Sequence, residues 1–150
     1  IKLKYPTKEE ILAELYKPTG KEISAVREWK RIFYNNNWSK ITAEEKHRAL
    51  KGLILAICFS KNIDKKDWPE YQVGNLDWCY STETKTILAN GEKPSIVSAV
   101  HELGHHLFGH SEKTACRFSV GIFKECFPKT FSKLEWKGHM LMAPEKNATK

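Results

Sequence analysis

Residues 1–68 place apolar side chains three or four positions apart, which is the spacing of an amphipathic helix. A threonine that can cap a helix precedes each of three such segments, and in the third a glutamate follows three residues later, as in a capping box. The expected helices run from Thr7 to Tyr16, from Thr19 or Gly20 to the asparagines at 35–37, and from Thr42 to Asn62.

The pattern changes between residues 69 and 91, where short runs of aromatic and β-branched residues alternate with turn residues. Such runs are typical of short strands. We expect strands at residues 71–73, 76–80 and 84–89, forming a small antiparallel sheet. The last strand would then lie directly before the next helix.

Helical spacing returns at Pro94 and Ser95, which favour the start of a helix, and it stops at Gly109, which can adopt a left-handed backbone. Ser111 can cap a further helix that extends to Cys126. The core-facing stripe of the first of these helices is formed by Val100, Leu103 and Leu107.

These elements predict an α+β fold: a mainly helical single domain with a small antiparallel sheet packed beside the helix that follows it. A length of 150 residues suits one domain with a sizeable core. The expected parts are N-terminal helices (1–68), the sheet (69–91), two paired helices (92–128) and a C-terminal tail (129–150).

The composition gives expectations about membrane spanning, cellular location and oligomeric state. The apolar run at residues 49–59 is too short and too interrupted to span a membrane, so we expect a buried core helix there. No secretory signal is visible, although the chain begins at Ile1 rather than Met, and we expect a cytoplasmic protein. A domain of this size is compatible with a monomer or a dimer.

The four cysteines show no metal-binding spacing. Cys58, Cys79, Cys116 and Cys126 form no C-x-x-C pair, and a domain this large does not require disulfides. We therefore expect free thiols, with Cys58 and Cys116 as ordinary core residues.

The net charge of +7 lies almost entirely in the N-terminal helices. Residues 1–68 hold 15 Lys/Arg against 9 Asp/Glu, whereas residues 69–150 hold 10 against 9. A basic face can bind nucleic acid or an acidic partner. No helix-turn-helix signature, stacking motif or Cys/His finger accompanies the charge, so a solvated lysine-rich surface is the favoured interpretation and nucleic-acid binding the alternative.

One short segment specifies chemistry. His101-Glu102-Leu103-Gly104-His105 has the form H-E-x-x-H, which is typical of zinc-dependent hydrolases. With 3.6 residues per turn, His101 and His105 lie on one helix face and can bind the same cation. Glu102 lies about 100° further round the helix. It is therefore placed to act as a general base beside the metal, not as a ligand.

A catalytic zinc usually takes three protein ligands and leaves one position open. Three residues after the motif are candidates for the third ligand: His110, Glu112 and His139. We favour Glu112, because small residues on its helix would let that helix pack closely against the first. His106 points away from the other two histidines and is expected to be a helix-face residue.

The segment that joins this motif to Glu112, Ala115, Phe118 and Ser119 resembles zincin metallopeptidases of the gluzincin type. The nearest match is the IrrE/ImmA family of small phage and bacterial metallopeptidases. The resemblance covers residues 84–128 and implies a strand before the H-E-x-x-H helix and a glutamate, here Glu112, that completes the zinc site. The chain departs from the family pattern at Thr114, at Cys116, where the family favours Asn, and in its short spacing from His105 to Glu112.

A metzincin site is the rival within the zincins. Its pattern, H-E-x-x-H-x-x-G-x-x-H, would need Gly one residue before Gly109 and His one residue after His110. Residues 140–144 resemble its methionine turn, but a one-residue change would aim the third imidazole elsewhere.

The predicted activity is zinc-dependent hydrolysis of a peptide bond in a peptide or protein substrate. Zinc would lower the pKa of its bound water towards about 7, and Glu102 would accept the proton. A second donor to the oxyanion is needed, and the candidates are Tyr80, His110, Arg117 and His139. The strand at 84–89 is the expected place for an extended peptide to pair.

Two other classes of function stay open. One is a zinc-binding regulatory or partner-binding module with little or no catalysis, in which the basic helices make the contact. The other is a helical domain without metal, in which the motif has arisen by chance.

Overall fold

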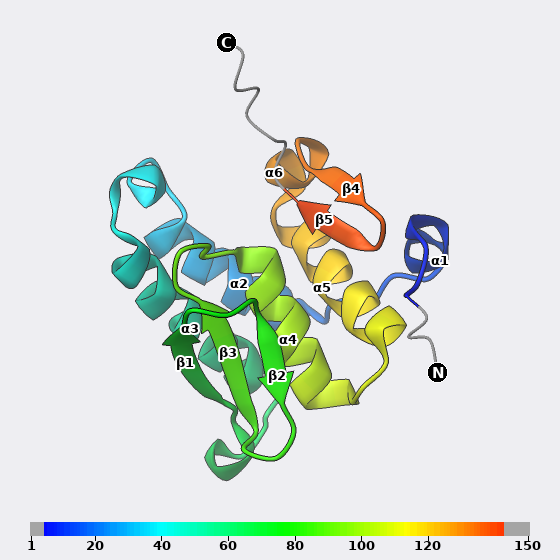
Figure 1. The fold of residues 1–150 in the computed structure, drawn as a ribbon. Helices are drawn as coiled ribbons and strands as arrows, with labels where there is room; N and C mark the ends of the chain where they lie inside the picture. The colour runs from blue at the N-terminus through cyan, green and yellow to red at the C-terminus, as the bar shows by residue number, and fades with distance from the viewer. Residues whose placement is uncertain (1–4, 143–150) are drawn as a thin grey trace.

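The structure, a computed structural model, describes residues 5–142. Ile1, Ala143 and Pro144, which entered the sequence interpretation, lie outside this range. The α-helices are α1 (Lys8–Ala13), α2 (Gly20–Phe33), α3 (Ala43–Ser60), α4 (Ile96–Phe108), α5 (Glu112–Cys126) and α6 (Pro128–Ser132). The strands are β1 (Glu70–Gly74), β2 (Cys79–Ser81), β3 (Thr86–Asn90), β4 (Glu135–Lys137) and β5 (Met140–Met142), and two short 3₁₀ helices span Trp38–Lys40 and Lys65–Asp67. The fold is therefore α+β and mainly helical, as predicted (Figure 1).

Threonine caps begin the first three helices. The hydroxyls of Thr7, Thr19 and Thr42 each accept a hydrogen bond from the backbone N–H three residues later, and all three form capping boxes. α1 nevertheless ends at Ala13, before the expected Tyr16. The backbone N–H of Tyr16 donates to the Arg117 carbonyl of α5 at 3.2 Å, a bond that takes the place of a further helical turn.

A buried carboxylate joins the α1–α2 connection to α3. Glu22 is 1% exposed and accepts hydrogen bonds from the Tyr16 hydroxyl at 2.7 and 2.8 Å and from Lys61 Nζ at 3.2 Å. Burial acts to raise the pKa of Glu22, but these bonds and the one from the Thr19 N–H lower it below its ordinary value. The charge is therefore compensated inside the fold.

The three-stranded sheet is mixed, with strand order β1-β3-β2. β2 pairs antiparallel with β3, as expected, but β1 pairs parallel with β3 on its other side. The chain forms no hairpin at Gly74-Asn75, because the Gly74 carbonyl accepts from the Gly91 N–H and Trp78 Nε1 donates to the Lys93 carbonyl. The second strand is accordingly shorter than expected and begins at Cys79.

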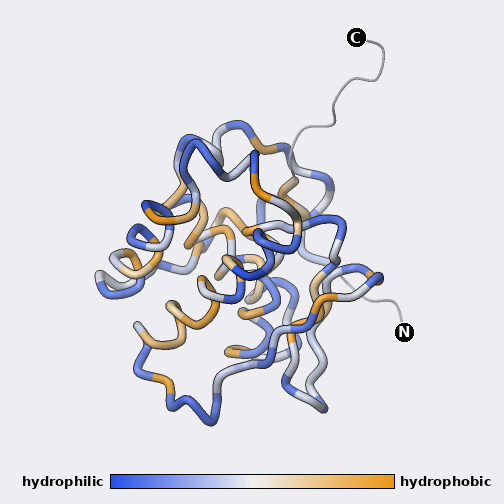
Figure 2. The backbone as a smooth tube through the Cα atoms, turned by 90° about the vertical axis from the view of Figure 1, so that its left-hand side faces the viewer, coloured by the Kyte–Doolittle hydropathy of each residue, from blue (hydrophilic) through white to orange (hydrophobic). Residues whose placement is uncertain are grey.

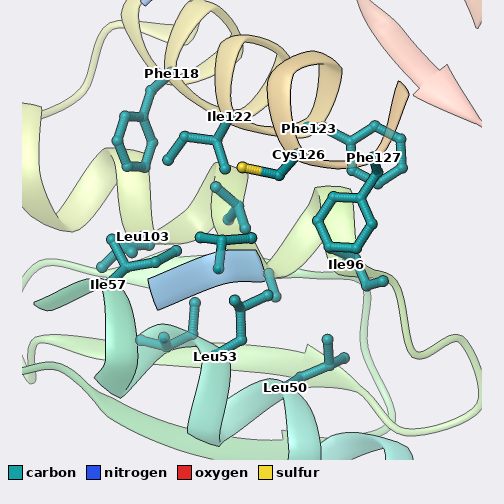
Figure 3. Packing of buried hydrophobic residues seen from close by; sticks show 14 of the residues in the cluster. Leu50, Leu53, Ile57, Ile96, Leu103, Phe118, Ile122, Phe123, Cys126 and Phe127 are labelled. Carbon is teal, nitrogen blue, oxygen red and sulfur yellow. The ribbon is translucent and has the colours of Figure 1, made fainter. Parts of the chain in front are cut away.

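The core lies between α3, α4 and α5, and Figure 2 shows apolar segments gathered towards the interior. Figure 3 shows side chains of α3, α4 and α5 meeting there. Val100 and Leu103 of the predicted stripe are buried, whereas Leu107 is partly buried. The labelled core residues are Leu50, Leu53, Ile57, Ile96, Leu103, Phe118, Ile122, Phe123, Cys126 and Phe127.

The C-terminal part described here is more structured than a tail. After α6, β4 and β5 form an antiparallel hairpin that lies beside α5 (Figure 1). Met140–Met142, part of the segment compared with a methionine turn, is the second strand of this hairpin. Its two-residue turn has Gly138 with φ of 61° at the first position, as a type II′ turn requires.

All four cysteines are free thiols, and Cys58 and Cys116 are buried as predicted. Among the helices of residues 5–142, none has the length and apolar character needed to cross a membrane.

The close approach of α5 to Tyr16 predicts a large effect at Gly121. A Cβ there would lie 2.2 Å from the Tyr16 carbonyl oxygen, so the backbone must shift to admit it. We expect Gly121→Ala to lower the free energy of unfolding by about 1–3 kcal/mol. The control is Gly52→Ala in α3, where the nearest atom is 4.0 Å away and alanine should add up to about 1 kcal/mol. Equal urea midpoints for the two variants would contradict this account of the contact.

Candidate metal centre

The two motif histidines lie on one face of α4. Ser95 caps this helix, its hydroxyl accepting from the Ser98 N–H at 3.1 Å, and the helix ends at Gly109 with φ of 96°. The rings of His101 and His105 are 4.9 Å apart between centroids. Helix geometry alone therefore brings the two imidazoles together, as the spacing predicts.

The third member comes from α5. Ser111 caps this helix by accepting from the Thr114 N–H at 3.2 Å, which makes Glu112 its first residue. α5 packs directly on α4, and a Cβ on Gly104 would lie only 3.1 Å from Ala115 Cα. This close contact at small residues positions Glu112 over the two histidines.

Glu112 faces both imidazoles. Its Oε1 lies 2.7 Å from His105 Nε2, and its Oε2 lies 3.3 Å from His101 Nε2. One ligand atom from each of the three residues lies within 4.8 Å of the others. Two imidazole nitrogens and a carboxylate oxygen at this separation form a donor set that can hold a metal ion.

Glu112 and His105 each stabilise the charged form of the other. Hydrogen bonds from His101 and His105 hold the pKa of Glu112 well below its ordinary value. The bond to Glu112 raises the pKa of His105, against the opposing effect of burial. His105 Nδ1 lies 2.8 Å from the Gly109 carbonyl, to which it donates, so Nε2 is the nitrogen turned towards Glu112.

Glu102 is placed differently from Glu112. It is 7% exposed, and burial raises its pKa, an effect that the nearby His101 and His105 reduce and the Glu112 charge increases. Two cavities, of about 770 and 300 Å³, are both lined by Glu102 and Glu112. Glu102 therefore lies beside the cluster and lines both cavities.

Of the proposed donors, His139 lies beside Glu112, and His110 and Tyr80 line the smaller cavity next to the cluster. His139 Nε2 lies 3.6 Å from Glu112 Oε2, and burial lowers its pKa. His110 is exposed and lines the smaller cavity. The guanidinium of Arg117 instead binds the Glu10 carbonyl and pairs with Glu14 of the N-terminal part.

Tyr80 and His106 bind each other. His106 Nε2 donates to the Asp67 carbonyl at 2.7 Å, so Nδ1 is free to accept the Tyr80 hydroxyl at 2.6 Å. The Tyr80 proton is thus directed to His106 rather than to the cluster. His106 is a helix-face residue, as expected.

The strand expected to pair with an extended peptide is not available for it. β3 is the central strand and is hydrogen-bonded to β1 on one side and to β2 on the other. β2 is the free edge beside α4, and its residues Cys79 and Tyr80 line the smaller cavity. The pairing strand was predicted wrongly because the order of three strands along the sequence does not show which of them is central in the sheet.

Sequence reasoning missed one contact of the cluster. Cys116 Sγ lies 3.8 Å from His101 Nδ1 and 3.8 Å from the His139 carbonyl oxygen. The spacing of Glu112 and Cys116, one helical turn apart, could have indicated that the thiol faces α4. Nothing in the sequence indicates the hairpin turn beside it.

Comparison with known proteins gives no match: no family model, no curated protein and no solved structure matches the chain.

The cluster predicts one high-affinity metal site that depends on Glu112. We expect Glu112→Ala to weaken zinc binding by more than about 100-fold, since even outer partners of metal ligands contribute 10–100-fold. Glu125→Ala, which removes an exposed carboxylate from the other end of the same helix, is the control. Competition with a chromogenic chelator measures both affinities. Unchanged affinity of Glu112→Ala would move the third ligand to His110 or His139.

Proposed function

We propose that the protein is a zinc-dependent endopeptidase of the gluzincin type, in which His101, His105 and Glu112 bind zinc and Glu102 is the general base. The observation that carries the proposal is the position of Glu112. A carboxylate from a second helix meets both motif histidines, while Glu102 stays outside the cluster beside open space. The resemblance of residues 84–128 to the IrrE/ImmA family supports the same assignment.

The donor set favours zinc. Two imidazoles and one carboxylate are a common set in catalytic zinc sites, where three protein ligands leave one position open. Zinc bound there would lower the pKa of water and polarise a substrate carbonyl.

Glu102 supplies the proton transfers in this proposal. Its carboxylate accepts a proton from the attacking water and delivers it to the leaving nitrogen of the scissile amide. Burial favours its neutral form, which suits a group that must hold the proton between the two steps. Glu112 is held ionised by the imidazoles and is therefore suited to binding a cation.

The two cavities provide room for a peptide on either side of Glu102. The free edge of β2 lines the smaller cavity, where an extended substrate backbone can pair with it. The larger cavity is lined largely by apolar side chains, among them Val97, Val120 and Phe123, and suits an apolar substrate side chain.

His139 distinguishes the peptidase from a module that only binds zinc. In the peptidase, its Nε2 donates a hydrogen bond to the oxyanion that forms at the substrate carbonyl. Because its Nε2 lies 3.6 Å from Glu112 Oε2, His139 is also the candidate for a fourth ligand, although it lies outside the group of three whose ligand atoms are all within 4.8 Å of one another. Four protein ligands would make a closed structural site, which is the arrangement expected of the regulatory alternative.

Glu102→Gln tests the proposed base. The amide cannot accept a proton, so peptide cleavage should fall by roughly 10²–10⁴-fold. Zinc stoichiometry should stay the same, because Glu102 is not a ligand. Peptide cleavage is followed with a library of fluorogenic peptides, and Glu125→Gln serves as the control. A Glu102→Gln enzyme with full activity would refute the peptidase mechanism.

His139→Ala separates the two functions. Loss of one oxyanion donor should lower kcat by about 10²–10³-fold, while zinc affinity should fall by far less than in Glu112→Ala. Titration with zinc and single-turnover cleavage measure the two effects on the same variant. A large loss of affinity would instead identify His139 as a ligand and favour the binding module.

A further inference from the structure

The turn of the β4–β5 hairpin lies against the metal centre. Its residue His139 contributes both its ring, 3.6 Å from Glu112, and its backbone carbonyl, which accepts from the Cys116 thiol at 3.8 Å. The hairpin and α5 are side by side in Figure 1. A segment far along the chain from the motif is therefore in direct contact with the cluster.

Cys116 connects this carbonyl to a motif histidine. When His101 uses Nε2 towards a cation, its Nδ1 carries a proton, and that nitrogen lies 3.8 Å from Cys116 Sγ. The carbonyl oxygen of His139 can only accept a hydrogen bond, so the proton of the Cys116 thiol points towards the hairpin. The sulfur accepts from His101 and the S–H donates to the His139 carbonyl.

The two histidines are consequently held in different ways. His105 donates to the Gly109 carbonyl at 2.8 Å, a strong acceptor on the end of its own helix. His101 faces a sulfur atom, a weaker acceptor whose other partner is in the hairpin. The orientation of His101 thus depends on where the hairpin lies, and the orientation of His105 does not.

The hairpin is short and depends on contacts with the rest of the domain. Each strand has three residues, and a two-stranded hairpin is at best marginally stable alone. Leu141 is buried at 8% exposure, the Tyr5 ring stacks on His139 at 4.4 Å, and Lys8 Nζ lies 6.0 Å from the Trp136 ring. The contact of the turn with the cluster is therefore one of the contacts that hold the hairpin in place.

We propose that Cys116 is a positioning residue that couples the β4–β5 hairpin to His101, so that zinc binding and hairpin docking stabilise each other. The proposal rests on the zinc site proposed above. Because coupling between two equilibria is reciprocal, a change that frees the hairpin must weaken zinc binding, and removal of zinc must loosen the hairpin.

The zinc affinity of Cys116 variants tests the proposed coupling. We expect Cys116→Ala to weaken zinc binding by about 10-fold, the lower end of the range for outer partners of metal-bound histidines. Cys126→Ala is the matched control, because Cys126 is a buried thiol of the same helix that lies in the core (Figure 3). Cys116→Asn should recover most of the affinity, since its amide can accept from His101 and donate to His139.

Gly138→Val tests whether a change in the hairpin turn affects zinc binding. No atom lies within 4 Å of a Cβ at this position, but φ of 61° is unfavourable for a β-branched residue, so the turn must change. Zinc binding should weaken although the substitution touches no ligand. Hydrogen exchange gives the reciprocal measurement: zinc should slow exchange of the amides of residues 135–142 in the wild type, and should do so less in Cys116→Ala.

Three results would overturn the coupling. Cys116→Ala and Cys126→Ala could bind zinc equally well, or zinc could leave hairpin exchange unchanged in the wild-type protein. A thiolate charge-transfer band after cobalt substitution would show that Cys116 is itself a ligand. If zinc binds tightly and Glu102→Gln is inactive, any of these results refutes the coupling alone. A wild-type protein that binds no zinc refutes the proposed function as well.

Discussion

The cluster of His101, His105 and Glu112 depends on the close contact between α4 and α5. The spacing of His101 and His105 is a property of one helix, whereas the third member of the cluster must come from another. Gly104 permits this, because any side chain at that position would press on Ala115 Cα. The two axes can then approach closely enough for a carboxylate at the first position of α5 to reach both imidazoles. A larger residue at Gly104 would move Glu112 away, while leaving the motif intact in the sequence.

The environments of two carboxylates make them chemically different. Glu112 receives hydrogen bonds from two imidazoles, and its ionised form is favoured. Glu102, on the next position round α4 from His101, is buried, and burial raises its pKa. Opposite shifts of this kind mark pairs of groups with different roles, one binding charge and the other exchanging protons. The packing of α5 on α4 contributes to both shifts, because it brings Glu112 to the histidines and brings the Glu112 charge close to Glu102.

The helix boundaries that the sequence predicted correctly depend on contacts between residues close together in the chain. Threonine and serine caps marked the starts of α1 to α5 correctly, and Gly109 marked the end of α4, because a cap is a contact between residues three or four positions apart. The parallel pairing of β1 with β3 could not be predicted, since it depends on bonds such as Trp78 to Lys93 that form only in the folded chain. The end of α1 was predicted wrongly for the same reason, because the backbone N–H of Tyr16 donates to a carbonyl of α5. Within the candidate site, the residues of α4 and of the start of α5 were predicted and His139 was among the candidates, whereas the hairpin that carries His139 was not predicted.

The part of the site that could not be predicted is also the part with the least local support. The helices that carry His101, His105 and Glu112 are anchored in the core, with Leu103 and Phe118 almost fully buried. The hairpin that carries His139 has two short strands and a single buried apolar side chain, Leu141. Local stability differs accordingly, and elements with few buried contacts open first. One wall of the larger cavity is built from this hairpin, so the shape of that cavity depends on its weakest element. A bound cation that holds His101 and Glu112 in place would therefore define the cavity as well as the chemistry beside it.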